Sequence, residues 1–140
     1  MGRIIDDVLA SADWISCALQ SSGYRADFSV QSLREIDRFF DEHSQNGAAK
    51  PGGLLSEGLG GRIFALGSYA GEVIRRQVGG DWIGDESDPE AEMNVMLRLP
   101  DGGLCWPIQR AMKRFGNGSE DSIAFWGDIA ISHDKPQPAS

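Results

Sequence analysis

The chain has 140 residues, of which 41% are hydrophobic and 24% are charged, and its formal net charge is −8. This length suits one domain with a core of its own, and the composition is typical of a globular protein. The excess of acidic residues disfavours binding to nucleic-acid phosphate or to anionic lipid, and it suits solubility or a basic protein partner.

No run of residues approaches the roughly 20 apolar ones needed to span a membrane. The acids Asp6 and Asp7 stand where a signal peptide needs an apolar run. The two cysteines, Cys17 and Cys105, are far apart in the sequence. This spacing predicts two small buried hydrophobic residues in a reducing compartment and not a disulfide. We therefore expect a cytoplasmic protein.

Two amphipathic helices are predicted first along the chain. Residues 4–20 carry apolar side chains at spacings of three and four, and Gly23 suits the end of that helix. The second helix begins at Ser32, which forms a capping box with Glu35, or one turn earlier at Ser29.

A loop at residues 45–53 separates these helices from the longest predicted one, at residues 54–78. That helix contains five glycines, and each interior glycine costs about 1 kcal/mol relative to alanine. Gly67 and Gly71 would let another backbone approach closely, so we expect this helix at the centre of the fold. Alternatively, the first glycines lie in a loop before a shorter helix.

The sheet is predicted between residues 81 and 106. A short strand surrounds Trp82, residues 93–99 alternate between apolar and polar side chains, and a Pro-Asp-Gly-Gly turn returns the chain to a partner strand at residues 104–106. Two further helices follow, one beginning at Pro107 and one capped by Ser119. The expected fold is therefore α+β, with about five helices around a small antiparallel β-hairpin or three-stranded sheet. We expect a single domain at residues 1–132 and a disordered tail at residues 133–140.

The residues that most enzymes use are scarce. The two histidines, His43 and His133, belong to no zinc-binding or nucleophile motif, and there is no phosphate-binding loop. The sequence therefore predicts no catalytic residue, no metal and no cofactor, and it favours a binding module over an enzyme.

The strongest concentration of charge lies between residues 81 and 92. We predict that a basic partner binds there, through Asp81, Asp85, Glu86, Asp88 and Glu90. The alternative is a loop that is simply solvated. A calcium loop is disfavoured because Ile83 would occupy a ligand position and Glu86 replaces the required glycine.

A second hypothesis places a ligand pocket at the junction of the long helix and the hairpin. Its predicted lining residues are Glu72, Trp82, Trp106 and Lys113. A buried Glu72 would be the one candidate general base. The alternative is a structural ion pair between Glu72 and a nearby arginine or lysine. Because the four tryptophans are spread one to each element, we expect them in the core.

Six motifs between residues 66 and 123 resemble a bacterial domain family that is itself of unknown function. They are LGSYAGE at 66–72, GGDW at 79–82, LPDG at 99–102, Trp106-Pro107, Lys113-Arg114 and Asp121-Ser122. Members of that family combine an LG.Y.GE helix with a GG.W strand, a hairpin and a P...KR helix. The resemblance supports the element order and implies no activity.

Together these features favour a non-enzymatic protein-binding module. Its size and acidity are similar to those of immunity proteins, so the most concrete expectation is an immunity or antitoxin-like protein that neutralises a basic toxin. The alternative is a small-molecule-binding protein or weak enzyme with a pocket near Glu72.

Overall fold

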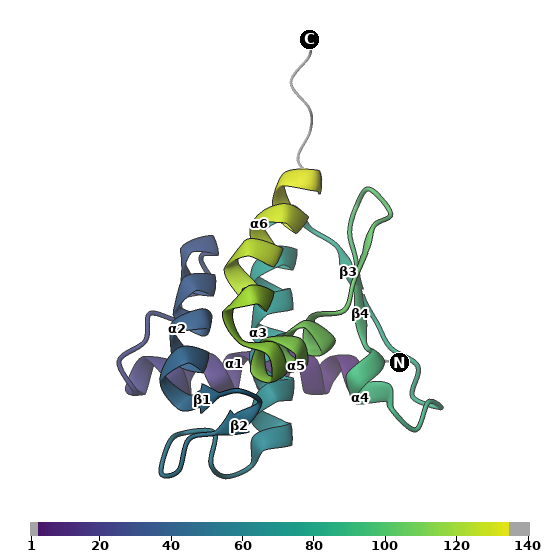
Figure 1. Ribbon diagram of the computed structural model, residues 1–140. Helices are drawn as coiled ribbons and strands as arrows, with labels where there is room; N and C mark the ends of the chain where they lie inside the picture. Colours follow the sequence, from purple (N-terminus) through teal and green to yellow (C-terminus); the bar gives the residue numbers. More distant parts are fainter. Residues whose placement is uncertain (1–2, 135–140) are drawn as a thin grey trace.

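The computed structural model describes residues 3–134, which contain six α-helices, one of them central to the fold (Figure 1). They are α1 (Arg3–Ser21), α2 (Leu33–His43), α3 (Leu59–Val78), α4 (Ala91–Asn94), α5 (Pro107–Asn117) and α6 (Ile123–Asp134). Two short 3-10 turns, η1 (Val30–Ser32) and η2 (Gly118–Asp121), precede α2 and α6.

Two small antiparallel sheets complete this part of the chain. The strands are β1 (Ser44–Gln45), β2 (Ala48–Ala49), β3 (Asp81–Ile83), β4 (Met96–Arg98) and β5 (Leu104–Cys105). β1 pairs with β2, and the second sheet has the order β3-β4-β5, in which Leu97 is opposite both Trp82 and Cys105. The predicted α+β fold with a small antiparallel sheet is confirmed.

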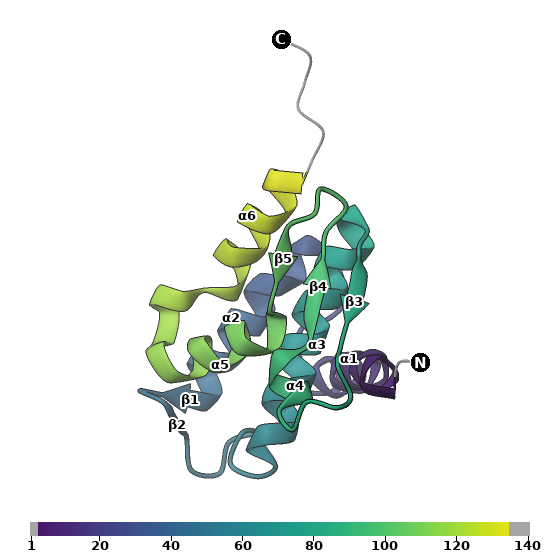
Figure 2. The ribbon, with the colours of Figure 1, turned by 90° about the vertical axis from the view of Figure 1, so that its right-hand side faces the viewer.

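Helix α3 lies at the centre, as the sequence predicts. α1 crosses it on one side, α6 and α5 pack on another, and the three-stranded sheet lies beside it (Figures 1 and 2). Residues 63–74 of α3 are buried without interruption. A helix that is buried on all its faces needs neighbours on all sides, and α1, α2, α5, α6 and the sheet supply them.

Gly67 and Gly71 explain how α5 and the sheet come so close to α3. A Cβ added at Gly67 would lie 2.6 Å from the Cα of Ile108, and one at Gly71 would lie 2.2 Å from the ring of Trp82. Both distances are far below van der Waals contact. The glycines in this helix are therefore required by packing, which offsets their unfavourable helix propensity.

A buried arginine joins α2, α5 and α6. Arg114 donates from Nε to the carboxylate of Asp37 (2.8 Å) and from Nη2 to that of Asp41 (2.6 Å). The same Asp37 carboxylate accepts the backbone N–H groups of Ile123 and Ala124, both at 2.9 Å. These are orphan donors at the start of α6, so an acid from α2 caps that helix.

Three elements differ from the sequence prediction. Helix α3 begins at Leu59 and not at residue 54, which agrees with the alternative of a loop before a shorter helix. The predicted strand over residues 93–99 is wrong in its first part, because Met93 and Asn94 belong to α4. The last helix begins after Ser122, whose hydroxyl accepts the N–H of Phe125 (3.1 Å), and Ser119 lies in η2.

The loop predicted at residues 45–53 overlaps the β1–β2 ribbon, which begins at Ser44 and turns at Asn46 and Gly47, both with positive φ. Asn-Gly is the sequence that favours such a turn. At the other end of the chain, α6 extends to Asp134. The remainder of the predicted disordered tail lies outside the described residues.

Two predictions of burial need correction. Cys105 is buried, but Cys17 is exposed because it lies on the outer face of α1. Trp82 is buried in the core, whereas Trp14 and Trp106 are 52% and 40% exposed. One tryptophan in each element therefore does not mean that every tryptophan lies in the core.

Candidate functional site

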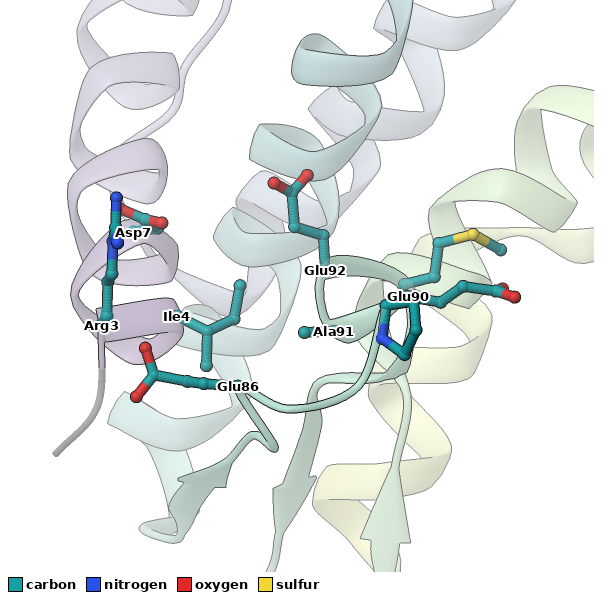
Figure 3. Close-up of a pocket in the computed structure, with 9 residues that line it drawn as sticks. Arg3, Ile4, Asp7, Glu86, Glu90, Ala91 and Glu92 are labelled. Atoms are coloured by element: carbon teal, nitrogen blue, oxygen red, sulfur yellow. The ribbon is translucent and has the colours of Figure 1, made fainter.

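A recess lies between the first turns of α1 and the acidic loop that leads into α4 (Figure 3). Its volume is about 490 Å³. The lining residues are Arg3, Ile4, Asp7, Glu86, Pro89, Glu90, Ala91, Glu92 and Met93. Figure 3 shows Glu86 extending from the loop toward the first turn of α1. The recess thus joins two parts of the chain that are remote in sequence.

Apolar packing holds the two walls of the recess together. Ile4, on the first turn of α1, is buried in the same cluster as Val95 and Leu97, which follow the acidic loop. Ile4 is 6% exposed, and Val95 and Leu97 are fully buried. The apolar side of α1 packs against α3 and this cluster, and Arg3 and Asp7 of its first two turns line the recess beside the loop.

Two aspartates shape the acidic loop itself. Asp85 accepts the backbone N–H (3.0 Å) and the hydroxyl (2.6 Å) of Ser87. Asp88 accepts the N–H of Glu90 (2.8 Å) and the side-chain amide of Asn94 (2.9 Å). The bonds from Asn94 and then from Glu90 lower the pKa of Asp88. These are turn-forming contacts, so Asp85 and Asp88 have a structural role.

The three glutamates of the loop and α4 have no such role. Glu86, Glu90 and Glu92 are exposed, and within residues 3–134 no arginine, lysine or histidine forms a salt bridge with them. The recess is lined by four carboxylates and one guanidinium, that of Arg3. Its net charge is therefore negative, and it suits a cationic group of a partner.

An apolar groove begins where the recess ends. Its volume is about 430 Å³, and it lies between α3, α4 and α5. The lining residues are Leu59, Gly60, Ile63, Phe64, Glu92, Met93, Ile108, Met112 and Phe115. Glu92 and Met93 line both cavities, so the acidic recess and the apolar groove are neighbours across α4.

The predicted partner-binding residues fall into three groups. Glu86 and Glu90 line the recess, while Asp85 and Asp88 shape the loop beside it. Asp81 is the first residue of β3, where it pairs with Arg98 at 3.9 Å. The predicted set did not include Glu92, which lies at the end of the same acidic stretch, or Arg3 and Asp7, because nothing in the pattern showed that the start of α1 faces this loop.

The structure brings two of the four predicted pocket residues into contact. Trp82 Nε1 donates to the carboxylate of Glu72 (2.8 Å). Arg75 donates to it through Nε and Nη2 (2.5 and 2.9 Å), and Arg76 through Nε (3.2 Å). Trp106 and Lys113 are exposed. None of the cavities described above is lined by Glu72.

These contacts keep Glu72 ionised. Its burial alone would raise the pKa of the carboxyl, but the hydrogen bonds from Arg75, Trp82 and Arg76 outweigh burial and lower the pKa. Glu72 is 1% exposed and both of its oxygens are occupied. The arrangement is that of a structural ion pair, which was the alternative to a general base.

His43 is also held by structural contacts. Its Nδ1 accepts the backbone N–H of Leu54 (3.1 Å), and its Nε2 lies 3.1 Å from the hydroxyl of Tyr24. Tyr24 in turn donates to Glu42. Burial lowers the pKa of His43, and burial together with the Glu42 bond raises that of Tyr24 to about 12. No group of three or more potential metal ligands occurs among residues 3–134.

Within the same residues, none of the helices combines the length and apolar character needed to cross a bilayer. Comparison with known proteins adds no assignment, because no family model, no curated protein and no solved structure matches this chain.

Proposed function

We propose that the chain is a non-enzymatic protein-binding module that engages a basic partner through the acidic recess. The observation that carries this proposal is the set of exposed carboxylates, Glu86, Glu90 and Glu92, which form no salt bridge with a described residue. Opposite charges across an interface accelerate association and select the partner. Because these three carboxylates form neither turns nor ion pairs within residues 3–134, they are available to attract and select a basic partner.

The most concrete form of the proposal is an immunity or antitoxin-like protein that neutralises a basic toxin. Such a protein needs a rigid surface that matches its target in charge and shape, and it needs no catalytic group. Hydrogen bonds and packing frame the recess, because Asp85 and Asp88 bond to the backbone of the loop and Ile4 packs the start of α1 into the core. The alternative, a ligand pocket near Glu72, has less support because that carboxylate is fully occupied.

Charge neutralisation tests this proposal. The double variant Glu86→Gln/Glu90→Gln should fold normally, because neither side chain bonds to a described residue. The partner is first captured from the cells of origin with the full wild-type chain as bait, and it is then purified. The rate constant for association of the double variant with this partner should be several-fold lower than that of the wild type, and it should depend less on salt concentration.

The control is Glu120→Gln/Asp128→Asn, which makes the same change in net charge at exposed positions of η2 and α6. It should retain most of the wild-type association rate. The proposal fails if both double variants slow association equally, or if the association rate is insensitive to salt.

A further inference from the structure

The apolar groove has a buried floor and exposed walls. Ile63, Phe64 and Ile108 form the floor and are 6%, 8% and 3% exposed. Met93 on α4 and Met112 on α5 stand at the sides and are 37% and 40% exposed. Flexible methionines on either side of a buried apolar floor are typical of surfaces that take up the side chains of a partner.

Gly60 keeps one end of the groove open. It lies in the first turn of α3, and a Cβ added there would meet no atom within 4 Å. The packing that requires Gly67 and Gly71 is therefore absent at Gly60. Gly61 is equally free of neighbours, but it does not line the groove. These two glycines form a matched pair for experiment.

The groove changes from apolar to acidic along its length. Its apolar part ends at Met93 and Glu92, and beyond them lies the recess with Asp7, Glu86 and Glu90. An occupant that spans both cavities must therefore carry apolar side chains on one stretch and a cation beside them. Charge complementarity disfavours an acidic occupant, and an apolar one without a cation would leave the carboxylates of the recess unmatched.

We propose that this continuous surface binds an amphipathic helix of a protein partner, with its apolar stripe in the groove and a lysine or arginine in the recess. Helices form the walls of the groove, so it offers no strand edge to which an extended peptide could add. This inference rests on the proposed function and specifies the chemistry of the partner.

The test uses the full chain and a synthetic peptide of roughly 18 residues, long enough to form a helix, with leucines on one face and lysines along its border. Gly60→Leu fills the groove and should raise the Kd of this peptide about tenfold or more, because a leucine side chain of the peptide loses its buried site. Gly61→Leu should leave the Kd unchanged.

Each outcome bears on one part of the inference. Equal Kd values for Gly60→Leu and Gly61→Leu would show that the groove is not the binding site. Met112→Glu places a charge in the side of the groove, so it should raise the Kd of the peptide as Gly60→Leu does. Equal Kd values for the lysine peptide and a glutamate version of it overturn the cationic flank. If Glu86→Gln/Glu90→Gln weakens binding of the peptide while Gly60→Leu does not, partner binding through the acidic recess is supported and helix binding in the apolar groove is wrong.

Discussion

Gly67→Ala should destabilise the protein, whereas Gly60→Ala, in the same helix, should stabilise it. At Gly67 the added Cβ would lie 2.6 Å from the Cα of Ile108 and 2.9 Å from the carbonyl oxygen of Pro107. These are backbone atoms, so α5 as a whole must move. Overpacking of this kind typically costs about 1–3 kcal/mol, and occasionally more. At Gly60 the space is open, and alanine should add up to about 1 kcal/mol of stability.

Urea unfolding of the two variants measures this difference. Gly61→Ala is the control for helix propensity alone, because its added Cβ also meets no atom within 4 Å. It should shift the unfolding midpoint in the same direction as Gly60→Ala. If Gly67→Ala unfolds at the same urea concentration as Gly60→Ala, α5 does not lie against α3 as described.

Among substitutions of single polar residues, Arg114→Met should lower the free energy of unfolding most. The Arg114 side chain is 3% exposed, and it joins α5 to Asp37 and Asp41 of α2. Its removal leaves the largely buried Asp37 carboxylate, which caps α6, without its cation. Breaking a buried ion pair by removing one partner costs about 3–5 kcal/mol.

Arg110→Met is the matched control for Arg114→Met, on the same helix. Arg110 pairs with Asp121 at 3.1 Å, but both side chains are about a quarter exposed, at 27% and 23%. Water therefore solvates the charges that remain, and the loss should be clearly smaller. Equal unfolding free energies for the two variants would show that the Arg114 network does not hold α5 and α6 to α2.

The sequence was sufficient to predict the helical framework because periodicity reports which face of a helix is buried. Helix α3 is the clearest example, since its glycines already indicated close packing at Gly67 and Gly71. The alternation around Met93 and Asn94 was misleading, because so short a run fits either a strand or one helical turn. From Asn46-Gly47 only a loop was predicted, although Asn-Gly favours the tight turn that joins two antiparallel strands, as β1 and β2 are joined.

Glu86 and Glu90 could be singled out from the sequence because the acids of this loop lie close together in the chain, whereas Glu92, which also lines the recess, was not among the predicted binding residues. The opposite wall could not be predicted, because it comes from Arg3 and Asp7 on α1, and only tertiary packing brings them to the loop. The same limit applies to Asp37 and Arg114, whose contact joins residues 77 positions apart. A local sequence pattern does not show which residues from distant parts of the chain come into contact.

The most direct test of the binding surface is a two-dimensional ¹H–¹⁵N NMR titration of the labelled chain with the leucine–lysine helical peptide. If the peptide binds across the groove and the recess, the largest shift changes occur in the first turns of α1 and α3, in residues 85–94 and along α5 near Met112. Another exposed apolar surface, formed by Phe125 and Ile129 on α6, provides the comparison within the same spectrum. Changes centred on α6 and absent from α4 would show that the peptide does not bind in the groove and the recess.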